Sequence, residues 1–472
     1  MTAIAKQLVA FVTSCVLTGC AAQRYRPAPI VASSTASQFE SRTLADAGLR
    51  SFEERSLGRP ISPWPPREWE LQTLSLAALY FNPSLDLVRA RLATAKGAVT
   101  TAGARPNPTF DFTPGVPSPY SLTQDFLFAI ETAGKRRLRV QIANNLNDAA
   151  RFDLVDSAWT VLVGVRSALL NYLVASRNLD LLRSEQKSRE DQVAILEQVL
   201  SAGEITRFDA DLARIDLSKT TVAIHTAEGQ VADAKAALAT AIGIPMGALD
   251  GIEFAWPDLD KPPTPTSLSA DRVQHDAVLN RLDIRRSLAQ YAAAEAALHL
   301  EIAKQYPNFN IGPGYTYEER NSFFTVGFST SLPVFNRNQG PIAEAEGRRK
   351  EAAAAFLQTQ AQVIEKGQRA LAVYTATLKE VAEAQSLYQL QEAQVQRVQE
   401  NIRAGADYRL SLDGAEIQAS IMARAQLDAL ARAQRALGDL EDAVQRPLAP
   451  GEVFPVNAES PGIDKLLQRE NR

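Results

Sequence analysis

The stretch RFDLVDSAWTVLVGVRSALLNYLVASRNLDLL, residues 151–182, decides the fold of this chain. It lies within a longer segment, Lys135–Ala202, that contains no proline and a single glycine, Gly164. Apolar residues recur there at alternating spacings of three and four, the repeat of a coiled-coil seam. We therefore predict one helix of roughly 65 residues, about 100 Å long; the alternative is several shorter helices folded back into a globular bundle. The seam residues are Phe152, Val155, Trp159, Leu162, Leu169, Leu173, Val193, Leu196 and Leu200.

The chain also contains an internal repeat. Three motifs of the first half return in the second half, in the same order and offset by roughly 200 residues, together with a second helical seam over Leu371–Ile402. Each half therefore predicts one helix, two short strands and two long helices joined at an Ala-Gly tip. The motif pairs are RPNPTF (105–110) with QYPNF (305–309), AIETAGKR (129–136) with SLPVFNRN (331–338), and SAGE (201–204) with RAGA (403–406).

The short segments alternate large apolar residues with small or polar ones, as at Phe324, Val326 and Phe328. A two-residue period places the large residues on one face of a strand. This pattern is typical of a membrane β-barrel, although a half-buried sheet in a soluble domain shows it too. About four strands cannot close a barrel, and open edges do not occur in lipid, so a barrel requires several copies. The predicted fold is mainly α with a small β part, in which three chains complete a barrel of about twelve strands.

Composition and charge exclude other classes. The chain has 472 residues, of which 46% are hydrophobic and 22% charged, and its formal net charge is −4. Because the basic residues are scattered among acidic ones, a nucleic-acid partner is not expected. Beyond residue 20 we find no run of about 18 apolar residues, so no membrane-spanning helix is expected.

The N-terminus has the layout of a secretory signal. Lys6 precedes the apolar run Leu8–Leu17, which is too short to span a bilayer, and Leu17-Thr18-Gly19-Cys20 resembles a bacterial lipobox. The resemblance implies cleavage before Cys20 and acylation of that cysteine as the lipid anchor. Ala21, the residue after the cysteine, implies sorting to the outer membrane. An ordinary signal with an incidental cysteine is the alternative.

These features predict six segments and one short helix near Phe39–Phe52. The segments are a signal peptide (1–19), a lipidated Pro-rich N-terminal segment (20–68), a first helix-strand-strand-helix repeat (69–256), a Pro-rich linker (257–269), a second repeat (270–446) and a C-terminal tail (447–472).

No catalytic or metal-binding constellation is found. The three histidines, His225, His275 and His299, have no ligand spacing, and both cysteines lie within the first twenty residues. We therefore predict no enzyme activity, no cofactor and no bound metal.

The tips of the long helices hold the candidate functional residues. Gly203 and Gly405 suit the C-terminal ends of the long helices. Thr206 is placed to cap the returning helix, with Asp209 in its first turn. The second tip adds three charged residues, Asp407, Arg409 and Asp413.

Four motifs together resemble the TolC-type outer-membrane factor family, most closely the branch that serves heavy-metal cation efflux of the cobalt–zinc–cadmium and copper–silver type. The resemblance covers about residues 40–446. It implies a homotrimer, an outer-membrane β-barrel above a periplasmic α-barrel, and tips that dock a periplasmic adaptor and an inner-membrane RND-type pump. The motifs are LAALYFNP (76–83), GARPNP (103–108), GKRR (134–137) and SLPVFNRNQG (331–340).

The resemblance also implies that the second tip closes the channel, because TolC-type tips use ion pairs and an aspartate ring. A ring of identical carboxylates is a cation-attracting constriction, and Asp407 or Asp413 would line it, with Arg409 pairing across protomers. The sequence departs from the pattern at Ser411, where an aspartate would be expected. Two other functions stay open: an exit duct for type I protein secretion, and a periplasm-spanning structural lipoprotein without a pore.

Overall fold

The computed structural model describes residues 25–116, 120–264, 273, 275, 277–279 and 281–448. The predicted signal peptide, Cys20 and nearly all of the C-terminal tail lie outside these residues. The chain forms two compact units that divide between Arg42 and Thr43. The described part of the first unit holds α2, Ala32–Glu40, which has no buried residue. The second unit contains all other elements.

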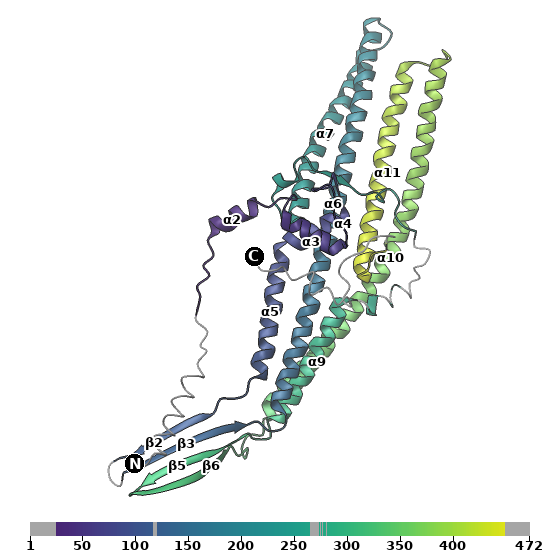
Figure 1. Ribbon diagram of the computed structural model, residues 1–472. Helices are drawn as coiled ribbons and strands as arrows, with labels where there is room; N and C mark the ends of the chain where they lie inside the picture. The colour runs from purple at the N-terminus through teal and green to yellow at the C-terminus, as the bar shows by residue number, and fades with distance from the viewer. Residues whose placement is uncertain are drawn as a thin grey trace. The chain divides into compact units, whose positions relative to one another are not determined.

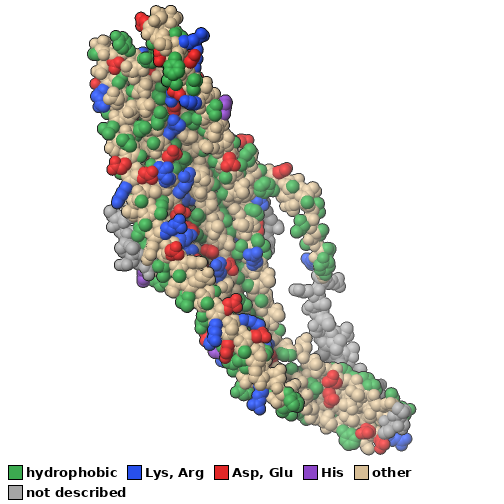
Figure 2. All heavy atoms as spheres, turned by 180° about the vertical axis from the view of Figure 1, so that it is seen from behind, with side chains coloured by type: hydrophobic (Ala, Val, Ile, Leu, Met, Phe, Trp, Pro, Cys, Tyr) green, Lys and Arg blue, Asp and Glu red, His purple; other side chains and the backbone are tan. Residues whose placement is uncertain are grey.

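The prediction of very long helices is confirmed. Helix α6 runs without a break over Lys135–Ser201, 67 residues, and α10 over Gln339–Arg403, 65 residues. Each is followed by a 36-residue returning helix, α7 (Arg207–Ile242) or α11 (Arg409–Val444) (Figure 1). The alternative of several short helices is therefore wrong. Acidic and basic side chains are interspersed over the helical part on the face that Figure 2 shows.

The helix predicted near 69–104 is two helices, α4 (Leu71–Phe81) and α5 (Pro83–Gly103). The break falls at Asn82, whose backbone is extended because the following proline disfavours the helical conformation there. Its side chain caps α5 by accepting a hydrogen bond from the Ser84 amide at 3.0 Å. The corresponding helix of the second half is α9, Leu282–Ala303.

The short helix predicted near residues 39–52 is also placed differently. The structure has α2 ending at Glu40 and a separate helix α3 over Ala47–Leu57. Asp46 starts α3, because its carboxylate accepts a hydrogen bond from the Leu49 amide at 2.9 Å.

The main hydrophobic core forms where α4 packs on α6 and α7, with Leu74, Leu162, Leu169 and Leu238 fully buried. Beside it, β1 (Glu68–Glu70) pairs in parallel with β4 (Glu253–Ala255), next to a short 3-10 helix, Met246–Leu249. The sequence did not predict this pairing.

One stretch of α6, within Lys135–Ser201, is long and apolar enough to cross a membrane by length and composition, contrary to the expectation from the sequence. Its mean hydropathy over 18 residues is 1.4, which is apolar enough for a span, but half of that stretch is buried inside the protein. Helix α6 supplies Leu162, Val165 and Leu169 to the main core. The apolar stretch is therefore explained as the buried seam of a core helix.

The two halves of the repeat are joined by polar contacts between α6 and α11. The buried side chains of Arg166 and Glu441 form an ion pair at 3.2 Å, and the Arg166 guanidinium lies 4.8 Å from the ring centre of Trp256. Trp159 donates a hydrogen bond to Asp442 at 2.8 Å. The halves thus pack into one unit rather than two separate domains.

The four predicted strands are confirmed, and they form one antiparallel sheet in the order β2-β3-β5-β6. The strands are β2 (Thr109–Gly115), β3 (Ser121–Ile130), β5 (Phe309–Glu318) and β6 (Asn321–Thr330). The register aligns large apolar side chains of neighbouring strands, so that one face is apolar. The opposite face is small or polar apart from Leu127 and Phe323. The exposed apolar face holds Phe110, Phe112, Phe126, Phe128, Ile130, Ile311, Tyr317, Phe324, Val326 and Phe328.

Candidate functional site: the helical tips

Both long helices end in the same hydrogen-bonded turn. At the first tip the Gly203 amide donates to the Leu200 carbonyl and the Glu204 amide to the Val199 carbonyl. This is the Schellman motif, in which the residue after the cap adopts a positive φ that glycine tolerates best. Gly203 has φ +78° and Gly405 has φ +74°, so both glycines end the long helices as the sequence predicted.

The first tip returns into α7 through a reciprocal cap. The Thr206 hydroxyl accepts from the Asp209 amide at 3.3 Å, and the Asp209 carboxylate accepts from the Thr206 amide at 3.1 Å. The Thr206 hydroxyl also donates to that carboxylate at 2.6 Å. These hydrogen bonds lower the pKa of Asp209. The predicted capping by Thr206 and Asp209 is therefore present, and it makes this tip a closed hydrogen-bonded turn.

The second tip is built differently. The Asp407 carboxylate accepts a hydrogen bond from the Tyr408 amide at 2.8 Å. A hydrogen bond with the Ser411 side chain is the main cause that lowers the pKa of Asp407, followed by the Tyr408 amide. Ser411, which stands where an aspartate was expected, thus holds Asp407 as a carboxylate.

Arg409 connects the second tip to the first hairpin. Its guanidinium donates to Asp413 of α11 at 3.0 Å and to Asp191 of α6 at 3.2 Å. The Asp413 side chain is 0% exposed, whereas that of Arg409 is 57% exposed. Burial raises the pKa of Asp413 more than the Arg409 charge lowers it. Within this chain, Arg409 therefore holds the start of α11 against α6.

A second layer of polar contacts lies deeper between α6, α7 and α11. The carboxylate of Glu185, 3% exposed, accepts from Arg189 at 2.8 Å and from Arg424 at 2.5 Å. The Ser188 hydroxyl donates to Glu416 at 3.1 Å. These contacts replace apolar packing at this level of the hairpins, so the two hairpins are joined here by charge and hydrogen bonds.

A cavity of about 530 Å³ opens between α6, α10 and α11 beside this network. Its walls are mainly polar. The lining residues are Ser184, Lys187, Ser188, Asp191, Tyr388, Glu392, Val395, Gln396, Gln399, Arg409, Glu416, Ala419 and Ser420.

The sequence located both tips but missed the residues that join them. Asp191 and Glu185 lie more than 200 residues before Arg409 along the chain, and no motif marks them or Glu416. One signal was available: Asp413, Ile417, Ser420, Arg424 and Leu427 continue a three-and-four spacing along α11. A polar residue at such a position must find a partner across the seam.

Within the described part of the chain, no group of three or more His, Cys, Asp or Glu side chains is placed to hold a metal ion. The polar groups of the tips are bound to one another by hydrogen bonds and ion pairs. The ion pairs of Arg409 can hold α11 against α6 or release it, and the Asp407 carboxylate can attract cations.

Comparison with known proteins gives this architecture a context. Residues 74–244 match the family model described as "Outer membrane efflux protein". The cobalt-zinc-cadmium resistance protein CzcC of Cupriavidus metallidurans is 24% identical over 276 residues, 58% of this chain and 64% of that protein. The pyoverdine export outer membrane protein OpmQ of Pseudomonas aeruginosa is 24% identical over 266 residues, 55% of this chain and 53% of that protein. This chain thus spans less than two thirds of the length of either relative.

The same fold is found among solved structures. The outer membrane protein VceC of Vibrio cholerae superposes with a TM-score of 0.65, covering 80% of this chain and 97% of that chain at 21% identity. This likeness shows that long helical hairpins joined to a small sheet form one common architecture.

Proposed function

We propose that this chain, whose residues 74–244 match the outer membrane efflux protein family model, is the outer-membrane channel subunit of a tripartite efflux system. In this role it is a passive exit duct, not an enzyme. An inner-membrane pump and a periplasmic adaptor deliver the substrates. Lipid on Cys20 would add an anchor to the same membrane.

The amphipathic sheet is the observation that carries this proposal. It presents ten exposed large apolar side chains on one face, and its outer strands β2 and β6 each pair on one side only. Four strands with two open edges are unsuited to lipid, because unpaired backbone groups are costly there. Three copies joined edge to edge would close about twelve strands into a barrel, with the apolar face toward lipid and the polar face toward a lumen.

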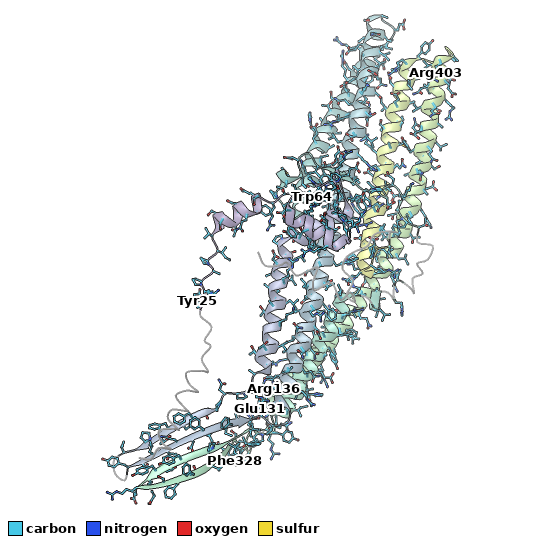
Figure 3. The ribbon with its side chains drawn as sticks, in the orientation of Figure 1. Tyr25, Trp64, Glu131, Arg136, Phe328 and Arg403 are labelled. Carbon is cyan, nitrogen blue, oxygen red and sulfur yellow. The ribbon has the colours of Figure 1, made fainter. Side chains whose placement is uncertain are left out.

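The helical tips lie at the far end of the hairpins from the sheet, where Figure 3 labels Arg403. We assign adaptor docking to this end, at the turns around Gly203 and Gly405. We also assign the constriction to Asp407, Arg409 and Asp413. Asp407 is half-buried and ionised, so it is the carboxylate available to a ring of three. Asp413 is buried against Arg409, so it reaches a lumen only when that ion pair opens.

Heavy-metal cations are the proposed substrates, because CzcC bears the name of a cobalt-zinc-cadmium resistance protein. OpmQ, named for pyoverdine export, represents the competing class of small organic substrates. If a strain that lacks this protein kept full tolerance to cobalt, zinc and cadmium, the proposal that these cations are the substrates would be contradicted.

The first test is single-channel conductance of the purified protein in a planar bilayer, with mass photometry of the same sample. We expect trimers that give cation-selective openings. Monomers without conductance would contradict the channel and favour a structural lipoprotein.

A further inference from the structure

The four connections between helices and strands meet at one end of the sheet. They comprise residues 101–108, 131–139, 301–308 and 331–340, which we call the strand–helix junctions. In the antiparallel register Ile130 pairs with Phe309, and Phe309 pairs with Thr330, so these connections lie at the same end of the sheet. Figure 3 labels Glu131 and Arg136 at this end.

Hydrogen bonds tie the junctions to one another. Thr132 donates to the Pro307 carbonyl at 2.8 Å, and Lys135 donates to Asn308 at 2.6 Å. Arg136 donates to the Gly103 carbonyl at 2.6 Å. The junctions therefore form a connected layer between the sheet and the helices.

This layer is strongly basic. It holds seven Lys or Arg residues and two Glu residues, a formal net charge of +5, although the whole chain carries −4. Both glutamates are already in ion pairs, Glu131 with Arg139 and Glu301 with Lys304 at 2.7 Å. The excess positive charge is thus concentrated at this level of the molecule.

Exposed apolar side chains lie among these charges. Phe335 is 98% exposed, and Leu332, Val334 and Tyr306 are 73%, 66% and 62% exposed. They lie in the two connections that join the strands of the second half to its helices. Three arginines of the layer, Arg105, Arg137 and Arg337, are exposed and come from three different junctions.

We propose that the strand–helix junctions bind the headgroups of anionic phospholipids through Arg105, Arg137 and Arg337. This proposal rests on the proposed function, because it requires the apolar face of the sheet to lie in lipid. Basic side chains next to a hydrocarbon boundary attract anionic headgroups, each adding to the affinity. Aromatic side chains such as Tyr306 and Phe335 favour the same interfacial level. A soluble polyanion would explain the charge but not the apolar side chains beside it, so a lipid fits better.

The test uses the full-length protein reconstituted in phosphatidylcholine vesicles that contain either spin-labelled phosphatidylglycerol or spin-labelled phosphatidylcholine. Electron paramagnetic resonance measures the fraction of each label that the protein immobilises. For the wild type we expect the anionic label to be favoured by about threefold or more. In the triple variant Arg105→Gln, Arg137→Gln, Arg337→Gln we expect this ratio to fall close to one.

Two control variants keep the result specific. Replacing the same three arginines with lysine keeps the charge and should keep the preference. The double variant Arg207→Gln, Arg403→Gln removes exposed arginines at the tips, so it should leave the preference unchanged.

Three outcomes would contradict the proposal, each in a different way. If the wild type co-floats with the vesicles in a density gradient and immobilises both labels equally, the headgroup site is contradicted, whereas the proposed membrane insertion of the sheet is supported. If the wild type immobilises neither label, the sheet is not in lipid, and both the proposed function and this site fall. If the preference survives in the glutamine variant, other residues hold the lipid and this assignment is wrong.

Discussion

Arg409 is the residue on which the geometry of the second tip depends most directly. It bonds to the buried Asp413 and reaches Asp191 on the first hairpin. In Arg409→Gln, Asp413 keeps its buried position without the guanidinium, so the start of α11 should loosen. Because Arg409 is more than half exposed, we expect a loss of about 1 kcal/mol, or roughly fivefold faster amide hydrogen exchange over residues 405–416.

Arg403→Gln is the matched control, because Arg403 is an exposed arginine of the same tip. The Arg403→Gln variant should show the same amide hydrogen exchange over residues 405–416 as the wild type. Equal exchange in Arg409→Gln and the wild type would show that Arg409 does not hold the tip. If the constriction proposal also holds, Arg409→Gln should alter single-channel conductance, whereas Arg403→Gln should alter it less.

At the scale of elements, α3 carries a pH-sensitive contact with the core. Glu53 is 0% exposed, neither of its carboxylate oxygens has a hydrogen-bond partner among the described residues, and burial raises its pKa from 4.5 to about 8. The folded state therefore binds a proton that the unfolded state releases between these pH values. The stability that this proton supplies is complete below pH 4.5 and is lost as the pH rises through 8.

Glu53→Gln removes this titration while keeping the size of the side chain. Between pH 5 and pH 8 the wild type should lose stability relative to this variant, by up to about 1.4 kcal/mol per pH unit. Tryptophan fluorescence during thermal unfolding, to which Trp64 and Trp69 contribute, measures this change. Glu68→Gln, at an exposed position, is the control and should leave the pH dependence of the wild type unchanged. Parallel pH profiles for the wild type and Glu53→Gln would contradict a buried, titrating Glu53.

Elements with a local periodic signal could be predicted, and elements made by distant contacts could not. The α6 seam and the four strands follow from spacings along the chain. The pairing of β1 with β4 joins Trp69 to Phe254 across three residues per strand, too short for any period to show. The same reason explains the tips: the caps at Thr206 and Gly203 are local, whereas the bond from Arg409 to Asp191 depends on how two hairpins pack.

At the scale of the whole molecule, the sheet is the part that a single chain leaves unfinished. The helical hairpins bury their seams within the chain, and Arg166 and Glu441 join the two halves. The sheet instead exposes an apolar face and two unpaired edges. Assembly and membrane insertion should therefore depend on which face of the sheet a substitution alters.

Val326 and Thr325 test this dependence, because they are neighbours in β6 with side chains on opposite faces. Val326→Lys places a charge on the apolar face, where lysine in lipid costs about 2–4 kcal/mol at the bilayer centre. We expect it to reduce the yield of membrane-inserted trimers, measured by heat-modifiable gel mobility and mass photometry. Thr325→Lys places the same charge on the polar face, so trimers should form and cation selectivity should fall. Equal insertion of both variants would mean that the apolar face does not lie in lipid. If Thr325→Lys prevented insertion and Val326→Lys did not, the polar face of the sheet would be the one toward lipid.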